Sequence, residues 1–216
     1  MIKDNFQFYH VPCATNSSCF EKDVYCENRA TYRKKYNISD NEIVFIYSGG
    51  VSAWQCVEET VQLYKRLSEK LNRKTRMLVF SHSFDTIKRL AAGDESIHID
   101  SYAPDELAKA LCAGDYAFLL RKDCITNNVA FPNKFLEYVQ SGMRIIATPY
   151  VYEIAQQVKD YSLGILYNMD GNINGIVEYL EKDGEIKYKY SPELINKVLN
   201  YNSFGNRLPA LVADIK

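Results

Sequence analysis

The chain has 216 residues, of which 47% are hydrophobic and 25% are charged, and its formal net charge is -1. These values are typical of a soluble globular domain and exclude the strongly basic surface that recruits nucleic acid or anionic membranes. No apolar run approaches the roughly 20 residues of a membrane span, and the N-terminus lacks the apolar core of a secretory signal, so we expect a cytoplasmic protein.

The cysteines and histidines show no spacing that predicts a metal site. The sequence contains six cysteines and three histidines, separated by irregular gaps, without a C-x-x-C or H-E-x-x-H pattern. We therefore expect reduced thiols, no metal and no other cofactor.

The N-terminal segment differs in pattern from the rest of the chain. Residues 1–20 lack a clear period and contain Pro12 and Asn16, which indicates a linking segment. We expect one domain over residues 21–216, beginning with a surface helix at 21–37.

Beyond residue 40, short β-branched or aromatic runs alternate with segments of helical period. This alternation is typical of βαβ units, so the predicted fold class is α/β, a doubly wound, Rossmann-like, six-stranded parallel sheet. The predicted strands are 42–48, 76–81, 96–100, 116–121, 144–148 and 163–168.

Helices are predicted between several of these strands. Apolar residues at three- and four-residue spacing indicate a long helix over 57–71, and Pro104 and Pro132 each suit a helix start. Gly142 ends the helix that Pro132 begins. Two more helices are expected over 172–182 and 191–203.

The first candidate site is the turn Ser48-Gly49-Gly50 after the first strand. Paired glycines let a backbone approach a ligand, and a helix N-terminus nearby favours a phosphate. Glycine also serves strand-to-helix turns for steric reasons alone, which is an equally good interpretation. A dinucleotide fingerprint is excluded, because the third glycine is missing and no acidic residue ends the second strand.

The second candidate site is the long segment 121–134, which follows the fourth strand. Arg121 ends that strand, and Asn133, Lys134 and Glu137 share one face of the following helix. Cations and free amides would hold a diphosphate, while a carboxylate would bind ribose hydroxyls. The alternative is an intrahelical pair of Lys134 with Glu137 and a solvated Arg121.

The second candidate site continues into the run Asn128-Val129-Ala130-Phe131-Pro132-Asn133-Lys134-Phe135-Leu136-Glu137-Tyr138, which is followed by Gly142. This run resembles the C-terminal domain of group 1, retaining glycosyltransferases of the GT-B fold. The resemblance extends over most of residues 38–182. It implies the C-terminal half of a GT-B fold and a donor domain for a nucleoside diphosphate sugar, UDP- or GDP-linked.

The resemblance also implies roles for single residues. Glu137 matches the carboxylate that binds the ribose, and Lys134 and Arg121 would stabilise the leaving diphosphate without a metal. The other candidate ligand contacts are Ser48, Gly49, Gly50, His82, Tyr102, Asn128, Pro132 and Asn133.

Two departures from the family pattern bear on catalysis. Val129 stands where many relatives carry a second glutamate. From the resemblance we also expect this chain to lack the N-terminal domain that binds the acceptor, a saccharide or lipid-linked glycan. The leading hypothesis is a glycosyltransferase donor domain, incomplete as a lone chain, that serves polysaccharide or glycoconjugate synthesis. The alternatives are a non-catalytic nucleotide-sugar-binding module and half of a nucleotide-sugar 2-epimerase.

Overall fold

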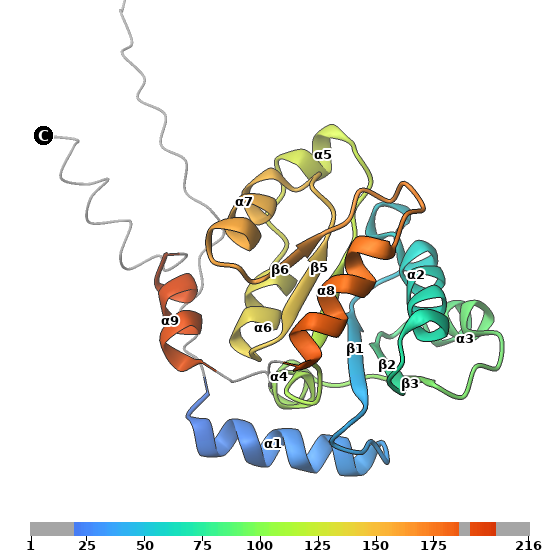
Figure 1. Ribbon diagram of the computed structural model, residues 1–216, viewed down its shortest axis with the longest axis vertical. Coiled ribbons are helices and arrows are strands. Elements are labelled where there is room, and N and C mark those ends of the chain that lie inside the picture. The colour runs from blue at the N-terminus through green and yellow to red at the C-terminus, as the bar shows by residue number, and fades with distance from the viewer. Residues whose placement is uncertain (1–19, 186–190, 202–216) are drawn as a thin grey trace, which may run out of the picture.

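A computed structural model describes residues 20–185 and 191–201 of the chain. Within them a six-stranded parallel sheet has the strand order β3-β2-β1-β4-β5-β6 (Figure 1). The strands are β1 (Ile43–Ser48), β2 (Thr75–Phe80), β3 (Ile97–Asp100), β4 (Tyr116–Leu119), β5 (Arg144–Ala147) and β6 (Gly164–Leu166). All six predicted strands and the doubly wound α/β fold are confirmed. The predicted linking segment, except residue 20, lies outside the described residues.

Helices connect and cover the strands. They are α1 (Lys22–Lys35), the short 3-10 helix η1 (Ala53–Gln55), α2 (Val57–Lys70), α3 (Phe84–Ala91), α4 (Pro104–Leu111), α5 (Ile125–Asn128), α6 (Lys134–Gln140), α7 (Tyr152–Asp160), α8 (Asn174–Glu185) and α9 (Pro192–Tyr201). The sequence predicted α1, α2, α4, α6, α8 and α9 and missed the others, including the one-turn α5 inside the segment predicted as a loop. Among the described helices, none is long and apolar enough to cross a membrane.

The start of α6 corrects the prediction that Pro132 begins this helix. The carbonyl of Pro132 accepts a hydrogen bond from the N–H of Phe135 at 3.0 Å, which makes a tight turn rather than an α-helical turn. The helix itself begins at Lys134. Gly142, with φ of 72°, follows its C-terminal end as expected.

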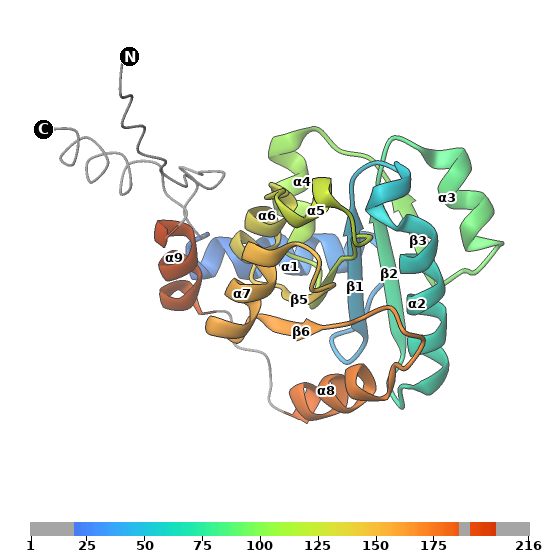
Figure 2. The same ribbon diagram turned by 90° about the horizontal axis from the view of Figure 1, so that it is seen from above.

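The two faces of the sheet form two apolar clusters, because alternate residues of a strand point to opposite faces. Val44 and Ile46 of β1 pack in one cluster with α1, α4, α6, α7 and α9. Phe45 and Tyr47 pack in the other with α2, α3 and α8. Figure 2 shows the helices in these two layers. All six residues of β1 are buried, as expected for a central parallel strand.

Helix α1 is anchored to the sheet through Asp115, which precedes β4. This carboxylate accepts hydrogen bonds from the backbone N–H of Val44 at 2.7 Å and from Arg29 at 2.5 Å. Arg33, whose side chain is buried, donates to the carbonyls of Ser39 and Glu42 at 2.8 and 2.7 Å. These hydrogen bonds fix the position of α1 against the sheet.

Candidate functional site

The strand order creates a switch point between β1 and β4. From β1 the chain continues to β2 and β3 on one side, and from β4 it continues to β5 and β6 on the other. In open α/β sheets, ligands bind at such a point, outside the carboxyl ends of the strands. The two segments that the sequence selected, 48–50 and 121–134, follow these two strands, so the fold brings them together.

Lys134, the first residue of α6, extends its side chain across Gly49. A Cβ atom on Gly49 would lie 1.9 Å from Nζ of Lys134, and the φ of Gly49 is 129°. Nζ donates a hydrogen bond of 2.9 Å to Oε1 of Gln55 and lies 5.0 Å from the centre of the Tyr47 ring. Position 49 therefore requires glycine for its backbone conformation and for the space that the ammonium group occupies.

Two tyrosines fix the turn that follows β1. The backbone N–H of Ser48 donates to the hydroxyl of Tyr138, a fully buried residue of α6, at 2.9 Å. The hydroxyl of Tyr47 donates to the carbonyl of Gly50 at 2.5 Å. Burial raises the pKa of Tyr47 to about 12, so this hydroxyl keeps its proton at physiological pH. The turn and α6 are thus held as one unit.

Arg121 lies just beyond β4 and is only 5% exposed. Its backbone N–H and carbonyl both bond to Oγ1 of Thr148 at 3.0 Å, and its Nη1 donates to the carbonyl of Leu120 at 2.8 Å. In the part of the chain that the structure describes, no carboxylate forms an ion pair with this guanidinium. A cation buried without a carboxylate is suited to bind an anionic ligand.

Lys134, Arg121 and Glu137 form a cationic region, because two positive side chains lie near one carboxylate. Burial, together with the nearby charge of Arg121, lowers the pKa of Lys134 to about 8, although Glu137 acts in the opposite direction. Burial raises the pKa of Glu137, and Lys134 opposes this shift. Within residues 20–185 and 191–201, Lys134 and Glu137 form no ion pair, so the intrahelical pair considered from the sequence is not observed.

A cavity of about 190 Å³ opens beside this cationic region, at the carboxyl ends of β1, β2 and β3. It is lined by Ser48, Gly49, Gly50, Phe80, Ser81, His82, Ser83, Ser101, Tyr102 and Leu107. Five of the residues that the sequence proposed as ligand contacts therefore share one cavity. Gly49 links the cavity to the cationic region, since it lines the cavity and lies against Lys134.

Besides Arg121, Lys134 and Glu137, three further proposed residues do not line the cavity. Asn128, at the end of α5, donates to the hydroxyl of Tyr152 at 3.0 Å and to Asp123 at 3.3 Å. Its Oδ1 atom is buried without a hydrogen-bond partner among the described residues. Pro132 and the exposed Asn133 form the turn before α6. They place Lys134 but do not face the cavity.

Sequence reasoning missed the residues that support the site. Tyr47, Gln55, Tyr138 and Thr148 hold Lys134, the glycine turn and Arg121 through the contacts given above. Tyr138 stands next to Glu137 in the run that carries the family resemblance, which was a usable signal. Gln55 offered none, because its partner Lys134 is 79 positions away in the sequence.

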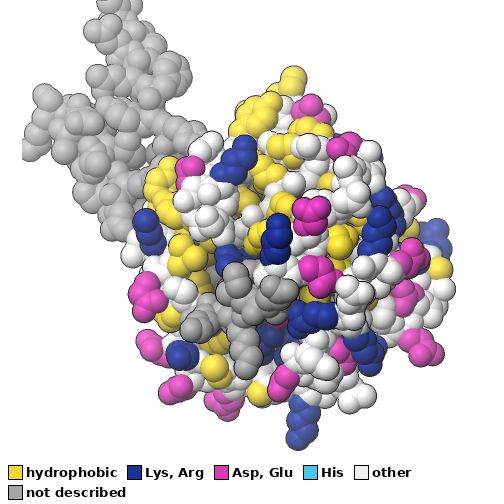
Figure 3. Space-filling view, viewed as in Figure 1, with side chains coloured by type: hydrophobic (Ala, Val, Ile, Leu, Met, Phe, Trp, Pro, Cys, Tyr) yellow, Lys and Arg dark blue, Asp and Glu magenta, His cyan; other side chains and the backbone are white. Residues whose placement is uncertain are grey.

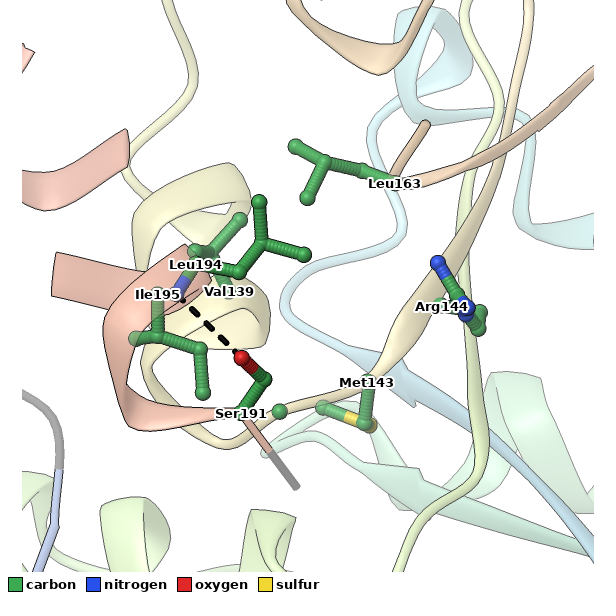
Figure 4. Close-up of a pocket in the computed structure, with 8 residues that line it drawn as sticks. Val139, Met143, Arg144, Leu163, Ser191, Leu194 and Ile195 are labelled. Atoms are coloured by element: carbon green, nitrogen blue, oxygen red, sulfur yellow. Dashed lines mark hydrogen bonds between the residues drawn. The ribbon is translucent and has the colours of Figure 1, made fainter. Parts of the chain in front are cut away.

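Other parts of the described chain offer less. A second cavity, of about 140 Å³, lies between α6, the start of β5 and α9, where Val139, Met143, Leu163 and Leu194 make it mainly apolar (Figure 4). It is at the amino ends of the strands, away from the switch point. No group of three or more His, Cys, Asp or Glu side chains that could hold a metal ion occurs among the described residues.

Neither a family model nor a curated protein matches the chain, but solved structures do. WaaG, a glycosyltransferase involved in lipopolysaccharide biosynthesis, is 19% identical with a TM-score of 0.60, over 92% of this chain and 54% of that one. The C-terminal domain of LpcC, a group 1 family glycosyl transferase from Francisella tularensis, is 16% identical with a TM-score of 0.59, over 82% and 97%. HepE from Anabaena, in complex with UDP-glucose, is 11% identical with a TM-score of 0.65, over 92% and 56%.

The chain has the fold of the C-terminal half of a GT-B glycosyltransferase. The match to almost the whole LpcC domain decides this assignment, and identities this low establish the fold alone. The chain spans about half the length of WaaG and HepE.

Proposed function

We propose that this chain is the donor domain of a glycosyltransferase and binds a nucleoside diphosphate sugar. The diphosphate would lie between Lys134 and Arg121, and the ribose hydroxyls would donate to Glu137. The base would enter the cavity that Tyr102 and His82 line, on the other side of Gly49. A cytosolic location belongs to the same proposal.

The observation that carries this proposal is the pair of cations at the switch point. Lys134 is partly buried over Gly49, Arg121 is buried beyond β4, and neither forms an ion pair with a carboxylate of the described residues. Excess positive charge in a partly dry site is stabilised by a bound anion. In the transfer reaction the same charge would stabilise the departing diphosphate, without any need for a metal.

The similar structures support a uridine nucleotide as the first ligand to test. One structure of HepE is a complex with UDP-glucose and another is a complex with UDP. WaaG is involved in lipopolysaccharide biosynthesis, which is consistent with a role of this chain in polysaccharide or glycoconjugate synthesis. Identity with either protein is too low to transfer the base or the sugar, so GDP belongs in the same test.

Transfer to an acceptor saccharide or lipid-linked glycan would need a second domain facing this site. Three large apolar side chains beside it are strongly exposed: Ile125 at 84%, Val129 at 81% and Tyr152 at 61%. Apolar side chains are visible at the α5 end of the molecule in Figure 3. An apolar rim of this kind suits contact with an acceptor-binding domain, which would also exclude water from the reaction.

Calorimetric titration of the chain with UDP, GDP and their common sugar conjugates tests the proposal. We expect saturable binding of one nucleotide, and Lys134→Ala and Glu137→Ala should each weaken it. Lys70→Ala is a matched control, because Lys70 ends α2 and hydrogen-bonds Asn174, far from the switch point. Absence of binding at millimolar concentration, or equal weakening by Lys70→Ala, would reject the proposed site.

A non-catalytic nucleotide-sugar-binding module is the second candidate function. It is favoured by Val129, which places an exposed apolar side chain where many glycosyltransferases carry a carboxylate close to the sugar. Both candidates predict the same nucleotide binding. Only turnover of a donor sugar in the presence of an acceptor-binding domain distinguishes them, and the module would show none.

A further inference from the structure

Tyr102 lines the candidate nucleoside cavity, yet the groups that hold its hydroxyl come from the distant helix α1. Nζ of Lys35, the last residue of α1, donates to the Tyr102 hydroxyl at 2.6 Å. Tyr36, the next residue, forms a short hydrogen bond with the same hydroxyl. These contacts join residues that are 67 and 66 positions apart in the sequence.

Asp100, at the end of β3, closes these contacts into a ring of hydrogen bonds. Its Oδ2 accepts from Lys35 at 3.0 Å and from the Tyr36 hydroxyl at 2.9 Å. Because the single hydroxyl proton of Tyr36 is donated to Asp100, the proton between the two phenols belongs to Tyr102. Each hydrogen bond in the ring then has one direction. The Tyr102 hydroxyl accepts from Lys35 and donates to Tyr36.

The ring of Tyr102 is held as firmly as its hydroxyl. Tyr32 of α1 and Phe80 of β2 meet it edge to face, with ring centres 5.8 and 5.4 Å away. Nζ of Lys35 also lies 4.6 Å from the centre of the Tyr102 ring. Such contacts are favourable for aromatic rings and leave the side chain little freedom to turn.

Protonation states support the same arrangement. Burial would raise the pKa of Asp100, but hydrogen bonds from Lys35, the Ser101 backbone and Tyr36 outweigh it and lower this pKa to about 2. Burial and the hydrogen bonds to Tyr102 and Asp100 raise the pKa of Tyr36. The carboxylate therefore stays ionised and the phenol stays protonated over the physiological range.

We infer that the C-terminal end of α1 is a positioning element for nucleoside binding: Lys35 and Tyr36 hold Tyr102 in the cavity wall in the orientation that receives the base. The inference rests on the proposed function, because it requires the cavity to receive the nucleoside. Neither Lys35 nor Tyr36 lines the cavity, so both act through Tyr102. Preorganised contacts of this kind raise affinity by reducing the ordering that a ligand would otherwise impose.

A double-mutant cycle tests this inference by calorimetry with UDP or GDP, whichever the unsubstituted chain binds. Tyr36→Phe and Lys35→Met should each weaken binding about fivefold, the effect expected for one lost hydrogen bond. Tyr102→Phe should weaken it similarly. Tyr36→Phe should then have no further effect in the Tyr102→Phe background, because the coupled hydroxyl is already absent.

Controls separate positioning from general loss of structure. Lys34→Met removes a neighbouring exposed lysine of the same helix and should leave the affinity unchanged. Lys35→Arg keeps a cationic donor and should restore most of the affinity that Lys35→Met loses. Unchanged binding by Tyr36→Phe, or effects that add fully with Tyr102→Phe, would overturn the inference while leaving the proposed function intact. If the unsubstituted chain binds neither nucleotide, the proposed function and this inference fail together.

Discussion

The side chain of Lys134 occupies the space that a Cβ atom on Gly49 would need. That Cβ atom would lie 1.9 Å from Nζ and 2.3 Å from Cε of Lys134, and the end of a lysine side chain can move away from such a clash. Moving it, however, would break the 2.9 Å hydrogen bond to Gln55 and remove the ammonium group from the switch point. The position of the Lys134 ammonium group therefore depends on glycine at position 49.

Gly49→Ala should weaken nucleotide binding and reduce stability. A φ of 129° is unfavourable for alanine, at a cost on the order of 1–3 kcal/mol, and the displaced Lys134 would no longer face a diphosphate. Calorimetry and urea denaturation would measure the two effects. Gly93→Ala is the matched control, because Gly93 also has a positive φ, of 78°, but lies outside the cavity, and a Cβ there would meet no atom within 4 Å. That control should reduce stability without changing the nucleotide affinity, and equal losses of affinity in the two variants would contradict this account.

Tyr138→Phe should destabilise the protein and weaken nucleotide binding. It leaves the buried N–H of Ser48 without its acceptor, which costs about 1–3 kcal/mol, and it loosens the glycine turn from α6. Tyr64→Phe makes a comparable change, since the Tyr64 hydroxyl donates to Ser96 at 2.7 Å. We expect that control to lower stability in urea without changing the nucleotide affinity. A binding defect in Tyr64→Phe would instead indicate a general effect of lost stability.

The sequence predicted all six strands and six of the described helices, and it selected the two segments that the fold brings together at the switch point, because both depend on local pattern. The alternating strands, the Gly49-Gly50 turn and Lys134 with Glu137 on one helical face can be recognised within a few residues of one another. The contacts that complete the site cannot. Lys134 meets Gln55 across 79 positions, and the cavity wall at Tyr102 depends on α1. Such pairings follow from sheet order and helix packing, which a local pattern does not determine.

Glu42 should make stability fall in acid. Burial alone would raise its pKa, but hydrogen bonds from Ser39 and the 2.8 Å ion pair with Arg76 outweigh it and lower the pKa to about 2. A pKa depressed on folding contributes stability above the unfolded value of about 4.5 and loses it as the pH falls toward 2. Glu42→Gln should therefore be less stable at pH 7 and lose less on acidification. Urea denaturation at several pH values would show this, with the exposed Glu69→Gln as the charge control.

Lys134 should make nucleotide affinity depend on pH above neutrality. Its pKa of about 8 means that the free protein loses this positive charge as the pH rises through that value. A bound diphosphate favours the charged form, so affinity should be highest below pH 8 and decline above it. The folding stability of the unliganded chain should change with pH in the opposite direction to the affinity. The pKa of Lys134 in the folded chain lies below the unfolded value of 10.5, so its contribution to stability rises between pH 8 and 10.5.

Lys134→Met assigns the pH dependence to this one group. The variant should bind nucleotide weakly at neutral pH, and its remaining affinity should not fall as the pH rises past 8. Tyr47, the nearest phenol, has a pKa of about 12 and stays neutral over this range, so it cannot supply the same titration. Calorimetry from pH 7 to 9.5 compares the two proteins. A decline in Lys134→Met that parallels the unsubstituted chain would show that another group controls binding, since methionine does not titrate.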